Sequence, residues 1–392
     1  MRTVGTQAFG IRIPIILVGD DLPEIVVTSV LEYFEEAGSE PDDGDIIGVT
    51  ETVVARAQGN YATVEQIASD VRAKFPSGPV GIVFPITSRN RFSILLKGIA
   101  AGAEKLYIQL SYPMDEVGNH IVSEDQVFEA GINPYTDVFS EAEFRARFSE
   151  TKHEFTGMDY MKLYRELGKG AEIILANDPC EILKYTKQVI AADIHTCERT
   201  KKRLKAGGAE TVCGLSDILN KSVDGSGYNE KYGLLGSNKS TEEKVKLFPR
   251  LCDEFVENVK RLFYEKTGKD IEVLVYGDGA FKDPVGKIWE LADPVVAPAY
   301  TSGLDGLPNE LKLKYIADNE FAGLSSEEAR MAMIERIKNK DKDLKGTEAT
   351  EGTTPRRLTD LVGSLCDLVS GSGDKGTPVV LIKGYFDNYA SD

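Results

Sequence analysis

The stretch IEVLVYGDGAFKDP, residues 271–284, joins an apolar run to a Gly-Asp-Gly turn. The β-branched run predicts a buried strand, and Asp278 follows that strand directly. In open sheets, ligands bind beyond the carboxyl ends of strands, where glycines let a ligand approach the backbone. A carboxylate there suits Mg²⁺ or Mn²⁺, although Gly-Asp-Gly is equally typical of a plain turn. Lys282 and Asp283, close by, favour the functional interpretation.

Strands and helices are predicted on both sides of this run. Residues 11–19 (IRIPIILVG) and 44–57 (GDIIGVTETVVARA) are predicted as strands that flank a helix at residues 24–36. Towards the C-terminus, a helix at residues 357–369 is followed by a strand at residues 379–384. Further helices are expected at residues 242–267, 310–318 and 327–339.

The middle of the chain alternates apolar runs with helical stretches. The runs are PVGIVFPI, KLYIQLSY, AEIILAN and ETVCGL, and the helical stretches include FSILLKGIAAG, CEILKYTKQVI and CERTKKRLKAGG. Strands that alternate with helices predict a parallel sheet. The predicted fold class is therefore mixed α+β. We expect a discontinuous core with mixed β-sheets at residues 1–84 and 231–392, and an inserted α/β region with a parallel sheet at residues 85–230.

Length, charge and cysteine content restrict the class of protein. With 392 residues, the chain exceeds the size at which one hydrophobic core usually stops growing. Its 46 Lys and Arg against 63 Asp and Glu give a formal charge of -17, which repels nucleic acid. Five cysteines without a CxxC pair indicate neither a disulfide framework nor a zinc site. Because the apolar run at residues 11–18 is too short to span a membrane, we expect a cytoplasmic protein with neither a nucleic-acid nor a membrane partner.

A second candidate site is the loop SGSGDKGTP, residues 370–378, between the last predicted helix and strand. Its glycines and hydroxyl groups are suited to cradle phosphate oxygens, and Lys375 adds positive charge. The spacing differs from that of a Walker A loop, and a plain helix-to-strand connection is the alternative. The candidate nucleotide contacts in this loop are Ser370, Gly371, Ser372, Gly373, Lys375 and Thr377.

Two further segments place polar residues at expected helix starts. In GTTPRRLTDL, Arg356 and Arg357 fall in the first turn of the predicted helix, where a bound anion would offset their unfavourable interaction with the helix dipole. In YGLLGSNKSTEE, Ser237, Asn238 and Lys239 precede an expected helix N-terminus, which is a ready anion site. A solvent-facing arginine pair and simple helix capping are the respective alternatives.

The segment PITSRNRF, residues 85–92, offers a third anion-friendly place of this kind. It puts Thr87, Ser88, Arg89 and Arg91 at a predicted strand-to-helix junction. The signal has low specificity on its own.

The histidines give weaker indications of chemistry. His120, His153 and His195 lie far apart in sequence and show no zinc-site spacing. Asp193 and His195 are close enough to form an acid–base pair, although such a histidine is more often structural. Because no nucleophile–base arrangement is evident, no catalytic residue is assigned.

Five segments resemble the gamma-glutamyl ligase family that adds glutamate to the deazaflavin coenzyme F-420. They are GIRIPIILVGDDL, DGDIIGVTETVVARAQG, GLLGSN, VLVYGDGAFKDP and DLVGSLCDLVSGSGDKGTPVVLIKG. GLLGSN, for example, is similar to the family's GVDASN, and all five segments follow the family's order. Residues 85–230 and 285–350 have no counterpart in short family members, so the chain resembles a long, divergent member.

The resemblance implies a GTP- or ATP-dependent amide ligase. In such an enzyme, an acceptor carboxylate is phosphorylated and the amine of L-glutamate then attacks the acyl phosphate. The resemblance also implies Mg²⁺ or Mn²⁺, a homodimer, and an α+β core unlike a P-loop fold. Carried over by position, Asp278 would be a metal ligand, Arg56 and Asn238 nucleotide contacts, and residues 370–377 the nucleotide loop.

The chain departs from the family pattern at several of these positions. Leu235 stands where the family has its first metal-binding aspartate, and a leucine cannot bind a metal. The metal ligands would then be Asp278 together with Asp283 and Asp374, or with Glu51, unless one of the family's metals is lost.

Three alternatives stay open. The acceptor could resemble F-420-0 or a folate-type pteridine. The chain could instead be a non-catalytic nucleotide-binding protein that retains the fold. In a third interpretation the middle region binds a different small molecule, which depends on whether Arg89, Arg91 and Asp193 converge on the cleft that contains Asp278.

Overall fold

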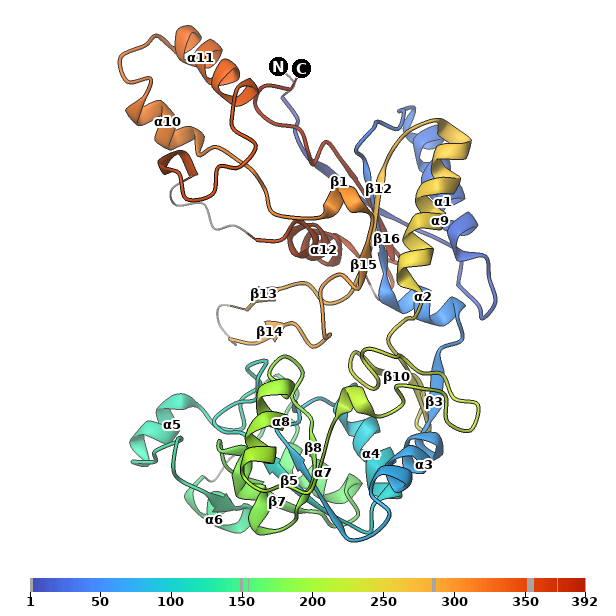
Figure 1. The fold of residues 1–392 in the computed structure, drawn as a ribbon, viewed down its shortest axis with the longest axis vertical. Coiled ribbons are helices and arrows are strands. Elements are labelled where there is room, and N and C mark those ends of the chain that lie inside the picture. Colours follow the sequence, from blue (N-terminus) through green and yellow to red (C-terminus); the bar gives the residue numbers. More distant parts are fainter. Residues whose placement is uncertain are drawn as a thin grey trace.

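The computed structural model describes residues 3–148, 151–153, 155–283, 287–350, 356–371 and 373–391. Two large sheets, each covered by helices, form two lobes (Figure 1). We call the lobe around the five-stranded sheet the first lobe and the lobe around the six-stranded sheet the second lobe.

The first-lobe sheet has the strand order β1-β16-β2-β12-β15. β2 and β12 are parallel, and the other neighbours in the sheet are antiparallel. This mixed sheet confirms the α+β fold class. Its strands are β1 (Gln7–Ile11), β16 (Val379–Lys383), β2 (Ile46–Thr50), β12 (Glu272–Tyr276) and β15 (Ala299–Tyr300).

Helices cover both faces of the first-lobe sheet. α1 (Leu22–Ala37) and α9 (Cys252–Thr267) pack on the face that carries Val49, whereas α12 (Leu358–Val369) packs on the face that carries Leu274 (Figure 1). Successive side chains of a strand point to opposite faces. Because both faces are buried, β2 and β12 are apolar along nearly their whole length.

The second-lobe sheet has the order β6-β7-β5-β4-β8-β9. All neighbours are parallel except the edge strand β6, which is antiparallel to β7. The chain enters at the central strand β4, runs outward through β5 and β7, and then crosses to the other side for β8 and β9. This confirms the expected parallel sheet. Its strands are β4 (Pro79–Val83), β5 (Lys105–Leu110), β6 (Phe139–Ser140), β7 (Glu172–Leu175), β8 (Gln188–Ala191) and β9 (Thr211–Gly214).

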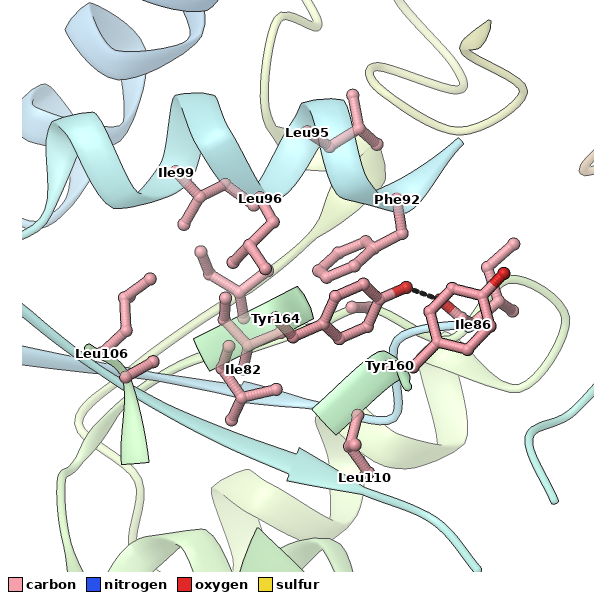
Figure 2. Packing of buried hydrophobic residues seen from close by; sticks show 14 of the residues in the cluster. Ile82, Ile86, Phe92, Leu95, Leu96, Ile99, Leu106, Leu110, Tyr160 and Tyr164 are labelled. Atoms are coloured by element: carbon pink, nitrogen blue, oxygen red, sulfur yellow. Dashed lines mark hydrogen bonds between the residues drawn. The ribbon is translucent and has the colours of Figure 1, made fainter. Parts of the chain in front are cut away.

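The second lobe is also covered on both faces. α3 (Val64–Lys74), α4 (Phe92–Gly102) and α7 (Tyr160–Leu167) pack on one face of the sheet, part of which Figure 2 shows. The 3-10 helix η1 (Pro179–Lys184) and α8 (Cys197–Ala206) pack on the other face.

Smaller elements lie between and beside the lobes. A three-stranded sheet joins β10, β11 and β3, and the hairpin of β13 and β14 lies between the two lobes (Figure 1). None of the helices within the described ranges is long and apolar enough to cross a lipid bilayer. The remaining elements are β3 (Tyr61–Thr63), β10 (Asn238–Lys239), β11 (Lys244–Lys246), β13 (Phe281–Lys282), β14 (Trp289–Glu290), α2 (Glu51–Ala57), α5 (Glu124–Glu129), α6 (Glu141–Arg147), α10 (Leu313–Asn319), α11 (Ser326–Lys338), η2 (Leu215–Asp217), η3 (Ser302–Leu304) and η4 (Glu348–Thr350).

Two predicted strands near the N-terminus are largely wrong. The strand expected at residues 11–19 ends at Ile11, because Pro14 cannot donate a ladder hydrogen bond and Ile15 points to solvent. The strand expected at residues 44–57 is a strand only as far as Thr50, after which the chain turns into α2.

Two predicted helices are also shorter than expected. The helix predicted at residues 242–267 begins at Cys252, because residues 244–246 pair with β3 as β11 and Pro249 interrupts the pattern. The stretch CEILKYTKQVI is not one helix, since η1 ends at Lys184 and the following residues form β8.

The division into a core and an inserted region stays a prediction, but its boundary at residue 85 falls inside the second lobe. α3 packs on α4, and β4 pairs with β5 and β8. α3 and β4 both precede residue 85, yet their contacts place them in the second lobe.

A substitution at Gly48 would test how closely α12 packs on the first-lobe sheet. A Cβ atom at this position would lie 2.4 Å from Cys366 Sγ and 3.3 Å from Tyr276 Cδ1. We expect Gly48→Ala to lower the free energy of unfolding by about 1–3 kcal/mol, as overpacked cores do. Chemical denaturation measures the change. Gly5→Ala, where a Cβ meets nothing within 4 Å, is the control, and an unchanged stability of Gly48→Ala would contradict the packing.

Candidate functional site

The loops after β4 and β8 of the second lobe contact the first lobe. Arg91, in the loop after β4, forms ion pairs with Asp278 and Asp293. In the loop after β8, His195 Nε2 lies 2.9 Å from the carbonyl oxygen of Leu291. β4 and β8 are neighbours from which the chain runs in opposite directions, and such a point is where open sheets bind ligands.

Buried hydrogen bonds fix the loop between β4 and α4. Asp115 accepts hydrogen bonds from the Thr87 backbone N–H at 2.7 Å and from Thr87 Oγ1 at 3.0 Å. The Tyr164 hydroxyl donates to the Ile86 carbonyl at 2.6 Å (Figure 2) and accepts from the Ser88 N–H at 2.9 Å. Burial raises the pKa of Tyr164 well above its ordinary value, so the hydroxyl keeps the proton that it donates. The loop is therefore held in one shape before any ligand arrives.

A cleft with a volume of about 390 Å³ opens between this loop and the β13–β14 hairpin. Asp278 is the acidic residue in its wall, whereas Arg89 and Arg91 bring positive charge. Arg89 is exposed and forms no ion pair with any described residue, so its charge is available to an anion. The remaining polar and aromatic groups in the wall are Thr87, Ser88, Asn90, Asn119, His153, Thr156, Tyr160 and Trp289.

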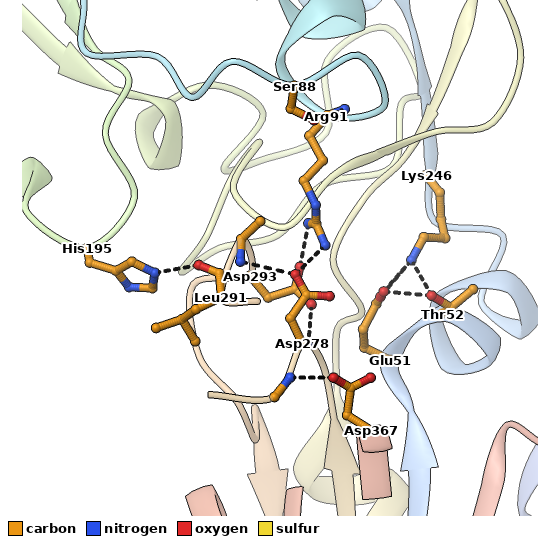
Figure 3. Close-up of polar contacts among 12 residues, drawn as sticks. Glu51, Thr52, Ser88, Arg91, His195, Lys246, Asp278, Leu291, Asp293 and Asp367 are labelled. Atoms are coloured by element: carbon orange, nitrogen blue, oxygen red, sulfur yellow. Dashed lines mark hydrogen bonds and ion pairs between the residues drawn. The ribbon is translucent and has the colours of Figure 1, made fainter. Parts of the chain in front are cut away.

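One guanidinium group bridges two aspartates at the edge of this cleft (Figure 3). Arg91 lies 2.7 Å from Asp278 Oδ2 and 2.6 Å from Asp293 Oδ1, with a different nitrogen on each. The Asp293 side chain is 1% exposed and the Asp278 side chain 22%. Burial alone would lower the pKa of Arg91, but the two carboxylates outweigh burial and raise it.

The end of β12 is fixed by carboxylates from other segments. The Asp278 N–H donates to Asp293 Oδ2 at 2.9 Å, and the Gly279 N–H donates to Asp367 Oδ2 of α12 at 2.8 Å. The Ala292 N–H donates to Asp278 Oδ2 at 3.1 Å. Burial raises the pKa of Asp367, and the negative charge of Asp293 adds to this effect. Asp278 is therefore held in the cleft and does not point away into solvent.

A second buried ion pair lies beside the first (Figure 3). Lys246 Nζ is 2.7 Å from both carboxylate oxygens of Glu51 and 3.0 Å from Thr52 Oγ1. Both charged side chains are buried, at 4% exposed for Glu51 and 8% for Lys246. Burial raises the pKa of Glu51, Lys246 lowers it, and Asp293 raises it again. Glu51 and Asp293 therefore belong to one group of interacting charges.

Of the predicted nucleotide contacts, Ser237 and Lys239 lie close to the cleft. Ser237 and Arg91 line an adjoining apolar hollow together with Leu235, and Ser237 Oγ is buried without a hydrogen-bond partner among the described residues. The Lys239 N–H donates to the Asn90 carbonyl at 2.7 Å, which ties β10 to the loop after β4. Asn238, the other member of β10, pairs with β11.

The predicted C-terminal loop starts close to the end of β12. Asp367, which accepts from Gly279, precedes Ser370 by one turn, and Ser370 Oγ donates to the Asp367 carbonyl at 3.2 Å. The Gly371 N–H donates to Thr377 Oγ1 at 3.1 Å and closes the loop. Gly373, Asp374 and Lys375 are exposed within it, and Ser372 lies outside the described residues.

The other predicted contacts lie elsewhere. Arg56 is on α2, and its Nε donates to the Ile16 carbonyl, so it anchors the N-terminal segment. Arg356 and Arg357 precede α12, which begins at Leu358, so neither lies in its first turn as predicted. Asp193 does not line the cleft, because its carboxylate accepts from Thr196 and Thr200.

The predicted metal ligands are not brought together. Asp278 lies in the cleft, whereas Asp283 and Asp374 are exposed on the hairpin and the C-terminal loop. Glu51, the alternative ligand, gives both its oxygens to Lys246. Within the described ranges, no group of three or more His, Cys, Asp or Glu side chains is arranged to hold a metal ion. The donor set at this site does not fit the expected metal.

The sequence did not indicate that Asp293, Lys246 and Asp115 belong to the site. Lys246 occupies an alternating position in KVKLF, and Asp293 precedes a proline in a segment without regular structure. A charged residue between buried positions, as Lys246 is between Val245 and Leu247, was the one available signal. Each of the three has a partner that is distant in sequence: Arg91 for Asp293, Glu51 for Lys246 and Thr87 for Asp115.

The buried Glu51–Lys246 pair predicts a large and pH-dependent loss of stability in Lys246→Met. We expect the free energy of unfolding at pH 7.5 to fall by about 3–5 kcal/mol, because Glu51 is left as an uncompensated buried charge. Burial already raises the folded-state pKa of Glu51, and the substitution removes Lys246, which is the group that lowers this pKa. Stability should therefore recover as the pH falls towards 5 and Glu51 binds a proton.

Lys239→Met is the matched control for this measurement. Lys239 lies on the neighbouring strand β10, and its partner Glu242 is 81% exposed. An exposed pair contributes about 0–1 kcal/mol, so this variant should unfold almost like the wild type at every pH. Equal losses in the two variants would contradict the assignment of Lys246 as a buried partner.

Comparison with known families identifies the chain, although a comparison with curated proteins finds no match. Residues 10–384 match the family described as F-420-0:gamma-glutamyl ligase. The match covers nearly the whole chain and spans both lobes, including the residues that line the cleft. The protein therefore belongs to the F-420-0:gamma-glutamyl ligase family, a family of enzymes that form amide bonds with glutamate.

Proposed function

We propose that the protein is a nucleotide-dependent ligase that joins L-glutamate in gamma linkage to an acceptor carboxylate. An oxygen of the acceptor carboxylate attacks the terminal phosphorus of GTP or ATP, which releases the nucleoside diphosphate. The amine of glutamate then attacks the acyl carbon, loses a proton and expels phosphate. Membership of the ligase family supports the bond that is formed.

The observation that carries the proposal is the position of the cleft. Arg89 and Arg91 from one lobe and Asp278 from the other line the same cleft, which has a volume of about 390 Å³. A cleft between two lobes, at the ends of strands from both sheets, is the usual place for a small-molecule site. Its size suits one substrate with part of another.

The residues around the cleft have separable proposed roles. Arg89 would attract the phosphate groups, aided by the N-terminus of α4, where backbone N–H groups favour anions. The C-terminal loop, with Lys375 and Thr377, and the nearby Ser237 to Lys239 segment would hold the nucleotide. Mg²⁺ or Mn²⁺, which the family resemblance implies, stays a prediction.

The acceptor and the reaction are testable together. We expect phosphate release from GTP or ATP to require both glutamate and an acceptor, and we expect an F-420-0-like acceptor to be used in preference to a folate-type one. A protein that binds nucleotide in a thermal-shift experiment but releases no phosphate with either acceptor would instead be the non-catalytic alternative.

Asp278→Asn should reduce the rate of glutamate-dependent phosphate release by about a hundredfold or more. Loss of one preorganised electrostatic contact typically has an effect of this size. The asparagine keeps the size of the side chain but removes the charge that holds Arg91 at the cleft. Asp318→Asn, an exposed aspartate on α10, is the control and should keep the wild-type rate. Equal rates for Asp278→Asn and the wild type would remove Asp278 from the site.

We also propose that the protein is a homodimer, supported by an exposed apolar segment. Ile15, Leu17 and Val18 are 82%, 60% and 66% exposed, whereas Ile16 between them is buried. Backbone hydrogen bonds hold this segment on α2, since Gly19 N–H donates to the Ala57 carbonyl at 2.8 Å. A fixed apolar patch on a surface is typical of a protein interface.

The double variant Ile15→Ser/Leu17→Ser should convert the dimer into single chains. Light scattering coupled to size exclusion would then give the chain mass of 43.0 kDa, against twice this value for the wild type. Leu324→Ser, at a leucine that is 46% exposed in a different region, should leave the dimer intact. A wild-type mass of one chain would contradict the proposal.

A further inference from the structure

Four carboxylates gather where the two lobes meet. Glu51, Asp278, Asp293 and Asp367 come from four separate segments, and Asp293 raises the pKa of both Glu51 and Asp367 by its negative charge, in addition to their burial. Like charges this close destabilise one another unless cations compensate for them. Among the described side chains, Lys246 and Arg91 are the cations bonded to this group.

Arg91 stands between two of these carboxylates. Its two terminal nitrogens each contact a different aspartate, at 2.7 Å to Asp278 and 2.6 Å to Asp293 (Figure 3). An arginine fork can hold two carboxylates in fixed positions and keeps its charge at every physiological pH. The guanidinium side chain is 15% exposed, so water screens these contacts only weakly.

Both carboxylate oxygens of Asp293 and the Oδ2 atom of Asp278 already have hydrogen-bond or ion-pair partners. Asp293 uses Oδ1 for Arg91 and Oδ2 for the Asp278 N–H, and Asp278 Oδ2 also accepts from the Ala292 N–H. Leu235, which the family resemblance places at the position of the first metal-binding aspartate, lines the apolar hollow beside Arg91. The third oxygen ligand that a divalent ion would require is not available from this position.

We propose that Arg91 takes the place of a metal cation between Asp278 and Asp293. A guanidinium carried by the second lobe supplies permanently the positive charge that a divalent ion would supply reversibly. While it is in place, these two carboxylates bind no divalent metal. The affinity of these two carboxylates for a divalent metal can be measured whether or not the protein catalyses the ligase reaction.

Titration with Mn²⁺ alone, followed by the electron paramagnetic resonance signal of free Mn²⁺, tests this inference. The substrate-free wild type and Asp278→Asn should have the same weak affinity for Mn²⁺. Arg91→Met, which removes the guanidinium but keeps much of the side-chain volume, should bind Mn²⁺ at least tenfold more tightly than the wild type. The gain should disappear in Arg91→Met/Asp278→Asn.

Arg89→Met is the matched control, because Arg89 belongs to the same loop but forms no ion pair with a described residue. It should leave the Mn²⁺ affinity at the wild-type value. Thermal unfolding gives a second readout: Mn²⁺ should raise the melting temperature of Arg91→Met and leave that of the wild type unchanged.

Two results would overturn the inference. The first is tight Mn²⁺ binding by the wild type that Asp278→Asn abolishes, because the carboxylates would then bind metal beside Arg91. The second is a folded Arg91→Met variant with no gain in affinity. If Arg91→Met does not fold, the comparison of the wild type with Asp278→Asn decides the question by itself.

Discussion

The contact of Arg91 with Asp278 and Asp293 is the constraint on which the arrangement of the site depends. It joins the loop after β4 of the second lobe to the end of β12 of the first lobe, at distances of 2.7 and 2.6 Å. Breaking a largely buried pair of this kind leaves an uncompensated charge, which is strongly unfavourable. The two lobes are therefore held at one separation, and the cleft between them keeps its width.

The same electrostatic requirement extends to the rest of the junction. Glu51 and Lys246 form a second buried pair, and Asp367 accepts from the backbone just beyond Asp278. Each carboxylate is placed by a different element of the first lobe, and each has a donor from another segment. Charge that would be costly when buried alone becomes tolerable because each carboxylate has a partner that is itself held in place.

The two lobes contribute different parts of the proposed site. The first lobe supplies Asp278 and the loop after α12, whereas the second lobe supplies Arg89 and the N-terminus of α4. An apolar hollow, lined by Leu234 and Leu235 among others, lies beside them. The chain therefore combines the fold of a glutamate-ligase family with an apolar hollow beside the charged residues of the cleft.

The sequence by itself determined the fold class, the parallel sheet of the second lobe, and the position of Asp278 at the end of a buried strand. These follow from local periodicity and turn residues, which act over a few positions. It also singled out Arg89 and Arg91, but it could not pair Arg91 with Asp278, which lies 187 residues further along the chain. Only the tertiary structure decided that Asp293 and Lys246 belong to the site and that Asp283 and Asp374 lie apart, because ion pairs depend on distances in space that local sequence does not encode.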